Sequence, residues 1–322
     1  MSDVVVCLHA AQGWDRAAQG VVGAGRELAA ATSAKLRAVV LGTASEPLVN
    51  GLADRVDILQ LTDGQGLDNA DGERLLAALT VLCQNAGTVL LGSDVQSQEL
   101  APRLAHRLGG SSMADGVELI AAGDLLRVRR AAYGGRAAAV YELKRRPAVV
   151  WLRARSFAPA PARDETVELQ RPVLNLAPKA SVRVVERRVE KSDGVPLEEA
   201  ALVVSGGRGL GGPEPFEDLK KLADVMGAAI GASRVACDEG WVPPSWQVGQ
   251  TGKKVAPDLY LAIGISGAAQ HLLGITDAKV VAAINTDPDA PILKQASFAL
   301  IEDYKKAVPA LIEKLAALRS DS

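Results

Sequence analysis

The sequence predicts an α/β protein of two domains, and three observations support this. The chain has 322 residues, about twice the ~150 residues of an average domain. In both halves, short apolar runs alternate with longer Ala- and Leu-rich segments of helical spacing, which is typical of parallel sheets covered by helices. Between the halves, residues 158–200 combine prolines with mixed charges, as expected of a linker.

The first half is expected to begin as a parallel sheet. Strands are predicted at 4–8, 36–41, 58–61 and 88–91, and helices at 13–31, 72–85 and 98–108. The strand runs are apolar at nearly every position and do not alternate with polar residues. We therefore expect both faces of this sheet to be buried by helices.

After residue 116 the pattern changes to short runs separated by glycine-containing turns. The runs 117–120, 125–132, 137–142 and 148–152 predict antiparallel strands that extend the sheet. We place the domain boundary near 180–198, which gives an N-terminal domain of residues 1–185 and a C-terminal domain of residues 198–322. The charged, proline-rich connector is read as a solvated linker and not as a nucleic-acid contact.

The second half restarts the alternation and predicts a doubly wound domain. Strands are expected at 201–204, 228–232, 259–263, 280–284 and 298–301, and helices at 216–226 and 304–318. Loops of small and polar residues follow several of these strands. Such loops meet at the carboxyl edge of a parallel sheet, where ligands bind.

Composition excludes several classes of protein. A net charge of −2 gives no basic excess for nucleic acid or an anionic membrane. The three cysteines are far apart, and no His, Cys or Asp cluster has metal-ligand spacing, so a disulfide framework or metal site is not expected. No basic, apolar leader and no apolar run of ~18 residues is present. We expect a cytoplasmic protein without a membrane span.

The segment after the strand at 201–204 reads SGGRGLGG, so Gly207, Gly209 and Gly212 fit the pattern G-x-G-x-x-G. Glycines let backbone N–H groups approach a pyrophosphate because no Cβ blocks the way. The pattern alone is weak, since prolines follow it directly and it lies in mid-chain. Taken by itself it leaves nucleotide binding and a plain tight turn equally open.

Three further loops strengthen the case for a ligand. QVGQTGK (247–253), GISGAAQH (264–271) and AINTDPDAPI (283–292) are rich in glycine and polar side chains, and the last two directly follow predicted strands. Helix capping would explain one such loop, but hardly all of them. We therefore predict a binding site for a nucleotide-like ligand in the C-terminal domain.

These loops also carry a family resemblance. VVSGGRGLGG, GAAIGASRVACDEGWVP, QVGQTGKKVAPDLYLAIGISGAAQHLLG and AINTDPDAPI follow one another in this order. Together they resemble the C-terminal FAD-binding domain of the electron-transfer flavoprotein α subunit. Weaker likeness extends upstream through APRLAHRLG and AYGGRA. The resemblance implies FAD as cofactor.

The resemblance also implies roles for individual residues. Ser233 and Arg234 match a pair whose arginine lies against the isoalloxazine ring, where a fixed positive charge stabilises reduced flavin. Gln250 and Thr251 match residues that face the central and pyrimidine rings. His271 matches a histidine near the pyrimidine carbonyl, where a donor favours the anionic semiquinone.

Other matched positions lie along the rest of FAD. Ser266 and Gln270 match contacts to the pyrophosphate and ribityl chain, and Arg208 matches an arginine near the diphosphate. Asn285 and Asp303 match the adenosine end, although Asp303 is also a good N-cap for the last helix. The same loops add the remaining expected contacts: Gln247, Val248, Gly249, Gly252, Gly264, Ile265 and Gly267.

One turn departs from the family pattern. Before QVGQTGK the chain reads WVPPSW, and Pro244 and Ser245 stand where the family commonly has a different turn. Trp241 and Trp246 beside it fit either the core or a wall near the flavin.

By resemblance, the protein is the α subunit of a heterodimeric electron-transfer flavoprotein. Such a protein carries electrons through FAD from acyl-CoA or related flavin dehydrogenases, as in fatty acid β-oxidation, to a quinone oxidoreductase. It is a carrier without a dissociable substrate of its own. The N-terminal domain would hold the β subunit, and a flavin domain swinging on the connector is a further hypothesis.

Three alternatives stay open. An electron-bifurcating or nitrogen-fixation-associated α subunit would share these motifs, because its second flavin would lie mainly on the partner. An NAD(P)-binding oxidoreductase could use the glycine loop, but it needs an acidic residue about 20 residues on, and the following helix offers Asp218 and Asp224. A non-catalytic nucleotide-sensing module is the third.

Overall fold

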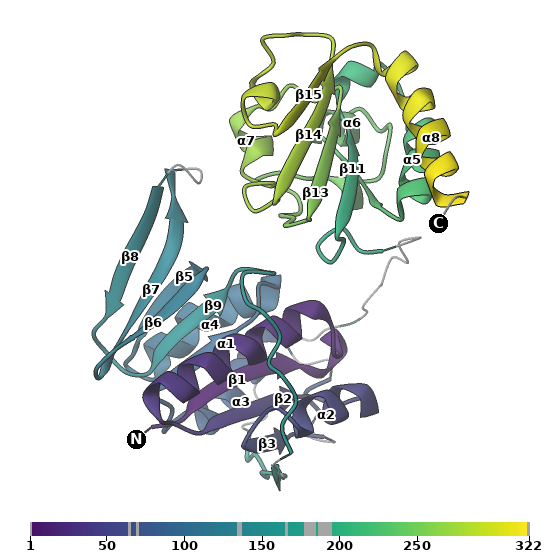
Figure 1. Cartoon of the computed structure of the whole chain (residues 1–322). Helices are drawn as coiled ribbons and strands as arrows, with labels where there is room; N and C mark the ends of the chain where they lie inside the picture. The colour runs from purple at the N-terminus through teal and green to yellow at the C-terminus, as the bar shows by residue number, and fades with distance from the viewer. Residues whose placement is uncertain are drawn as a thin grey trace. The chain divides into compact units, whose positions relative to one another are not determined.

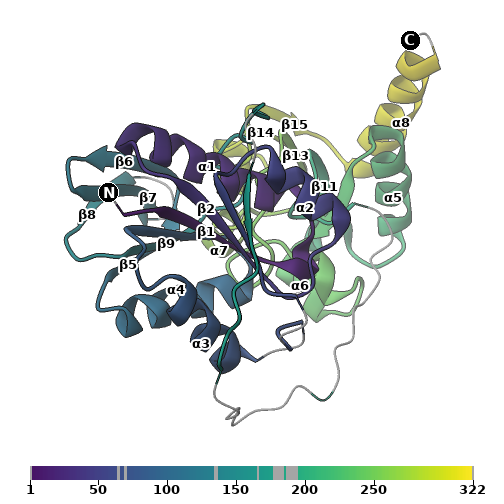
Figure 2. The same ribbon diagram turned by 90° about the horizontal axis from the view of Figure 1, so that it is seen from below.

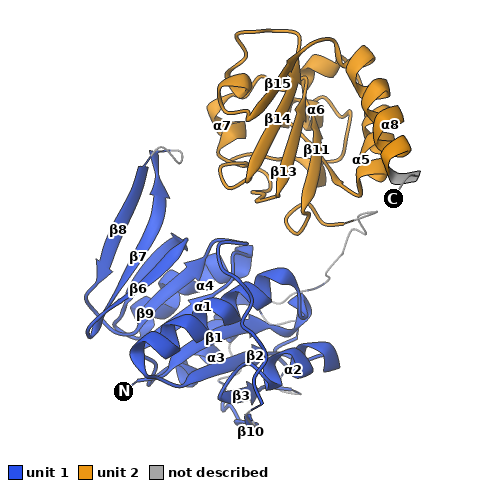
Figure 3. Ribbon diagram, viewed as in Figure 1, with its two compact units in different colours: residues 1–188 blue, residues 189–322 orange. Residues whose placement is uncertain are grey.

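The computed structural model describes residues 2–63, 66–68, 71–133, 137–164, 167–176, 185 and 195–320. Contacts divide the chain into two compact units, unit 1 (Met1–Arg188) and unit 2 (Val189–Ser322) (Figure 3). Most of the connector predicted near 180–198 lies outside the described residues.

Unit 1 is built on a seven-stranded parallel sheet of strand order β10–β3–β2–β1–β4–β9–β5. Its strands are β1 (Val4–His9), β2 (Leu36–Leu41), β3 (Ile58–Leu61), β4 (Thr88–Leu91), β5 (Ser111–Gly116), β9 (Ala148–Leu152) and β10 (Glu168–Gln170). Its helices are α1 (Arg16–Thr32), α2 (Glu46–Ala53), α3 (Gly72–Leu82) and α4 (Val95–Arg107). Aspartates 15, 71 and 94 cap α1, α3 and α4 by accepting a backbone N–H of the first turn.

The helices cover both faces of this sheet, as the apolar strand runs predict. Along β1, Val4 and Val6 pack into the core with α1 and α2, whereas Val5 and Cys7 pack into the core with α3 and α4. Figure 2 shows α1 on one side of the strands and α3 and α4 on the other. Successive side chains of a strand point to opposite faces, so a strand buried on both faces must be apolar throughout.

The region after residue 116 corrects one prediction. Strands β6 (Glu118–Ala122), β7 (Leu125–Ala132) and β8 (Ala137–Leu143) form a separate three-stranded antiparallel sheet. The antiparallel direction predicted for the run 148–152 is wrong. This run is β9, which pairs parallel with β4 and β5. The apolar pattern of a short run shows that it is buried, but not which strand it pairs with.

Unit 2 is a five-stranded parallel sheet of strand order β12–β11–β13–β14–β15. The strands are β11 (Leu202–Gly206), β12 (Ala229–Ala232), β13 (Leu259–Ile263), β14 (Val280–Asn285) and β15 (Phe298–Ile301). Counted from β11 this is the doubly wound order 2-1-3-4-5, in which the connections change direction between the first and third strands. The crevice between the ends of β11 and β13 is therefore where a ligand is expected.

Different kinds of segment cover the two faces of the unit 2 sheet. Helices α5 (Pro215–Met226) and α8 (Tyr304–Ser320) lie side by side (Figure 1), and with α6 (Arg234–Asp238) they bury one face. Trp241 and Trp246 pack at the margin of that core, as one of the two predictions for them requires. The other face is buried by α7 (Ala269–Leu272), by the 3-10 turn Pro291–Lys294 through Ile292, and by loop residues such as Leu197 and Val248.

Within the described ranges, no helix combines the length and apolar character that crossing a membrane requires. The same ranges contain no group of three or more His, Cys, Asp or Glu side chains placed to hold a metal ion. The three cysteines are free and buried, and the sulfur atoms of Cys7 and Cys83 lie 3.8 Å apart in the core of unit 1.

Helix α1 packs closely on the chain after β9, and two of its glycines differ in the space that they leave for a side chain. A Cβ at Gly23 would lie 1.8 Å from the carbonyl oxygen of Ala158, whereas one at Gly20 would lie 3.3 Å from that of Phe157. We expect Gly23→Ala to lower the free energy of unfolding of unit 1 by about 2 kcal/mol. Gly20→Ala is the matched control, since the new 3.3 Å contact is offset by a helix propensity gain of about 1 kcal/mol. Urea unfolding followed by circular dichroism measures both, and equal midpoints for the two variants would contradict this packing.

Candidate functional site

A cavity of about 680 Å³ lies at the carboxyl ends of β11, β12, β13 and β14 in unit 2. Its size is within the range of small-molecule and cofactor sites. It lies over the crevice between β11 and β13 that the strand order predicts. The loops predicted to carry the ligand site therefore do meet at one edge of one sheet.

Fourteen of the seventeen predicted contact residues line this cavity: Arg208, Ser233, Arg234, Gln247, Val248, Gly249, Gln250, Thr251, Gly264, Ile265, Ser266, Gln270, His271 and Asn285. Five residues outside the predicted set also line it: Gly209, Val235, Ala268, Asp287 and Ala290. Gly209 and Asp287 lie in loops that the sequence singles out, so their residue types and positions could have predicted that they line the site. Val235, in the short helix α6, and Ala268 and Ala290, in loops, carry no such signal, because an apolar side chain fits many roles at such positions.

The glycine turn after β11 has a packing role in addition to the one predicted from the sequence, which stays a prediction. A Cβ at Gly207 or Gly209 would lie 2.3 Å or 2.8 Å from the carbonyl oxygen of Gly264, on the loop after β13. The N–H of Gly209 donates to that same oxygen at 2.9 Å. Gly264 itself has a positive φ of 61°, which favours glycine. These glycines allow two loops to pack backbone against backbone and so form one wall of the cavity.

The loop 247–253 is held in the same way. The N–H of Val248 donates to Ala232 at the end of β12, and the N–H of Gln250 donates to the carbonyl of Gln270 at 2.8 Å. A Cβ at Gly274 would lie 2.4 Å from the nitrogen of Gly249. The backbone of this loop is thereby fixed between β12 and the α7 segment, and its side chains border the cavity.

Two of the predicted residues are structural and do not line the cavity. A Cβ at Gly252 would lie 2.4 Å from the carbonyl oxygen of Gln247, and one at Gly267 would lie 2.4 Å from the nitrogen of Ile292. Asp303 is also outside the cavity lining, and its carboxylate accepts the N–H of Lys305 at the start of α8. It has the capping role that its position before the helix allows, and its contact to a ligand stays a prediction.

Two arginines supply positive charge to the cavity. Arg208 belongs to the glycine turn, and Arg234 begins α6. The Nε of Arg234 donates to Asp238 at 3.1 Å, and both side chains are exposed. This exposed ion pair joins residues one helical turn apart. It contributes little to the free energy of unfolding, but it limits the orientations of the guanidinium.

Two polar groups at the cavity are buried without a hydrogen bond of normal geometry. One is the hydroxyl of Ser233, at the N-terminus of α6, and the other is Nδ1 of His271. Buried polar atoms are satisfied in the great majority of cases. An unsatisfied donor or acceptor at a cavity therefore points to a bound partner.

His271 is 7% exposed and in contact with a second polar side chain. Its Nε2 lies 3.0 Å from the hydroxyl of Tyr260, which is fully buried on β13. Burial lowers the pKa of His271 to about 4, and the backbone of Val248 opposes this more weakly. Burial also raises the pKa of the Tyr260 phenol well above its ordinary value. Near neutral pH both side chains are therefore uncharged.

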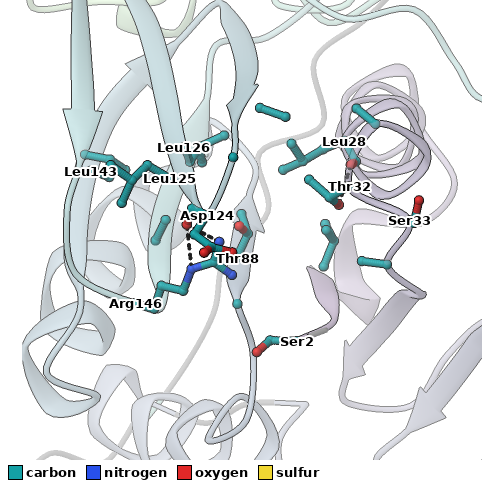
Figure 4. A pocket seen from close by; sticks show the side chains of 17 residues that line it. Ser2, Leu28, Thr32, Ser33, Thr88, Asp124, Leu125, Leu126, Leu143 and Arg146 are labelled. Atoms are coloured by element: carbon teal, nitrogen blue, oxygen red, sulfur yellow. Dashed lines mark hydrogen bonds between the residues drawn. The ribbon is translucent and has the colours of Figure 1, made fainter.

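A second cavity, of about 820 Å³, lies in unit 1 (Figure 4). It is bordered by the amino-terminal ends of β1, β4 and β9, by the end of α1, and by the β6–β7 turn. Arg146 donates there to the backbone carbonyl of Asp124. None of the predicted site residues lines it, and ligands of parallel sheets bind at the opposite, carboxyl edge.

The burial of His271 predicts a pH dependence. In the unfolded chain its pKa is about 6.5, so the unfolded state binds more protons between pH 6.5 and 4. The stabilising contribution is therefore complete above about pH 6.5 and is lost as the pH falls toward 4. Between pH 7 and 5 we expect unit 2 to lose about 2 kcal/mol more unfolding free energy in the wild type than in His271→Gln.

Urea unfolding at both pH values measures this difference. His106→Gln, on the exposed surface of α4, is the control for replacing a histidine elsewhere. An identical pH response of wild type and His271→Gln would show that His271 is not buried in its neutral form.

Comparisons with known proteins agree with this geometry. Residues 4–178 match the family model described as electron transfer flavoprotein domain, and residues 196–276 match the electron transfer flavoprotein FAD-binding domain. The first match covers most of the described part of unit 1, and the second contains the loops after β11, β12 and β13.

Three relatives span most of the chain. The electron transfer flavoprotein subunit alpha of Thermoanaerobacterium thermosaccharolyticum is 36% identical over 93% of this chain and 93% of its own. Protein FixB of Clostridium saccharobutylicum is 33% identical over 91% and 89%. The α subunit of Paracoccus denitrificans is 40% identical over 74% and 76%. The FAD-binding domain match makes FAD the cofactor. The chain belongs to the electron transfer flavoprotein α-subunit family.

Proposed function

We propose that the cavity of unit 2 holds FAD and that the protein carries electrons from flavin dehydrogenases, acyl-CoA dehydrogenases among them, to a quinone oxidoreductase. The observation that supports this most is the cavity itself, because fourteen residues chosen from family motifs surround one space at the carboxyl edge of the sheet. The family has an electron-transfer role, whereas the donor and the acceptor are part of the proposal.

The residues at the cavity fit such a cofactor. The Ser233 hydroxyl makes no hydrogen bond of normal geometry, Gln250, Thr251 and Ser266 line the cavity with further polar groups, and a flavin ring offers carbonyl and nitrogen acceptors. Arg208 and Arg234 offset the negative charge of a diphosphate or a reduced ring. The glycine-rich walls bring backbone close to the cavity without side chains between.

Bound FAD supplies the redox chemistry, and the chain supplies binding, orientation and electrostatics. Arg234 would hold a fixed positive charge beside the ring, and Thr251 and Gln250 would place polar groups along it. Gln247 donates to the Thr251 hydroxyl at 2.9 Å and so orients that hydroxyl. Asn285 donates to the carbonyl of Ile265 at 2.9 Å and fixes the loop after β14 against the loop after β13.

The NAD(P) alternative finds no support in unit 2. Strand β12 ends at Ala232 and is followed by Ser233 and Arg234, so no carboxylate stands there to bind a ribose. Asp218 and Asp224 are exposed on α5 and do not line the cavity. NAD needs the acidic residue for its 2′-hydroxyl, whereas NADP can use an arginine for its 2′-phosphate. Against NADP stands the match of residues 196–276 to an FAD-binding domain.

The partner is proposed to be a β subunit, held mainly by unit 1, in the cytoplasm. Coexpression of the two chains and purification of the complex tests the function directly. A yellow complex that accepts electrons from an acyl-CoA dehydrogenase supports the proposal, and a colourless complex that does not bind added FAD contradicts it. Because one relative is named FixB, the flavins must also be counted. One FAD plus AMP favours the plain carrier, and two FAD favour an electron-bifurcating protein.

Arg234 gives a prediction about the reduction potential. Arg234→Ala removes a positive charge from the cavity, so reduced flavin loses stabilisation. We expect the first reduction potential to fall by about 60 mV, which corresponds to a tenfold change in the one-electron equilibrium. Spectroelectrochemical titration of the purified complex measures it.

The control for this variant is Lys221→Ala, which removes an equal charge from α5, where Lys221 pairs with Asp218 at 2.9 Å. That variant should keep the wild-type potential. If both variants shift the potential equally, the effect comes from net charge and not from a contact of Arg234.

A further inference from the structure

Three polar side chains meet in the otherwise apolar core under the cavity. Ser205 lies on β11, Tyr260 on β13 and His271 on α7. In the strand register Val203 pairs with Tyr260, and Ser205 pairs with Ala262, so Ser205 and Tyr260 lie on the same face of the sheet. Leu, Phe or Ile at position 260 would fill this core without a polar group. The buried hydroxyl of Tyr260 therefore calls for an explanation.

The backbone makes room for this cluster. Gly231 pairs with Ser205 across the sheet, and a Cβ there would lie 3.2 Å from the Ser205 hydroxyl oxygen. Ser205 and Tyr260 are both fully buried. The Ser205 hydroxyl is near enough to the Tyr260 oxygen to lower the pKa of the phenol, although it falls short of normal hydrogen-bond geometry.

The protonation states decide the direction of the hydrogen bond between Tyr260 and His271. Both groups are neutral near pH 7, so each carries one proton to place. An imidazole nitrogen without a proton is a better acceptor than a serine hydroxyl, which favours the Tyr260 O–H as donor and Nε2 of His271 as acceptor across the 3.0 Å contact. The Ser205 hydroxyl then donates toward the Tyr260 oxygen, which agrees with its effect on the phenol.

We infer that Tyr260 is a positioning residue that holds His271 as the neutral tautomer with its proton on Nδ1, and so makes His271 a hydrogen-bond donor to the bound cofactor. Nδ1 makes no hydrogen bond of normal geometry, although the backbone of Val248 is close enough to His271 to raise its pKa, and His271 lines the cavity. In the other tautomer Nδ1 would be an acceptor and would repel the lone pairs of a carbonyl that gains negative charge. The inference rests on the proposed function, because the acceptor it needs belongs to FAD.

The first test uses the wild-type complex and no variant of the cluster. The chain has only three histidines, so nitrogen-15 histidine placed in this chain alone, which is then combined with an unlabelled β subunit, gives a simple spectrum. Spectra of His9→Gln and His106→Gln assign the remaining signal to His271. At pH 7 we expect its Nδ1 to carry the proton and its Nε2 to be unprotonated. A proton on Nε2, or a mixture of both tautomers, would overturn the inference.

The second test uses Tyr260→Phe, which removes the donor and keeps the ring. FAD content is measured first by absorbance. In a complex that retains FAD, we expect the His271 signals to become those of a tautomer mixture. The one-electron reduction equilibrium should shift about tenfold toward oxidised flavin, which is about 59 mV. Ser205→Ala removes only the outer donor and should give a smaller shift in the same direction.

The control is Tyr141→Phe, the same chemical change at a partly exposed position of β8 in unit 1, which should alter neither signal. Unchanged histidine signals and potential in FAD-loaded Tyr260→Phe would refute the role of Tyr260 and leave the proposed function intact. If Tyr260→Phe fails to fold, the wild-type spectrum still decides the tautomer. A wild-type complex without FAD would instead refute the proposed function.

Discussion

The close approach of loop backbones at the carboxyl edge of the unit 2 sheet is the constraint on which the site depends. Gly207 and Gly209 lie directly against the carbonyl of Gly264, and Gly274 lies against Gly249. Any side chain at these positions would push the loops apart. Since the loops are joined by backbone hydrogen bonds, their positions are set before any ligand arrives. The cavity is thus largely preformed, as expected of a site that must tune a tightly held group.

On this rigid frame the polar side chains have separate tasks. Arg208 and Arg234 bring a permanent positive charge to the cavity. His271 is the opposite case, because burial keeps it neutral and leaves its donor direction to a neighbouring hydroxyl. A redox carrier needs both kinds of group: a permanent charge that raises electron affinity, and a neutral donor that does so without adding to the charge of the cavity.

The strands of both units and the position of the candidate site could largely be predicted from the sequence. Apolar runs revealed the strands, and glycine-rich loops after them revealed the site, because a doubly wound sheet brings those loops together. The pairing partners of the strands could not be predicted, because an apolar run does not show which strand lies beside it. The run 148–152, for example, pairs parallel within the main sheet. Short elements with weak patterns, such as α2 and β5, were missed. The glycines were recognised, but their role in loop packing was not, because contacts between residues as distant as 209 and 264 leave no local pattern.

Amide hydrogen exchange of the chain with its β subunit, in the presence and absence of FAD, tests the central claim most directly. Bound FAD should slow exchange in the loops at 207–211, 247–251, 264–271 and 285–290, with no effect around the unit 1 cavity at 121–126. Protection around that second cavity, or unchanged exchange in the four loops, would show that the cofactor is held elsewhere.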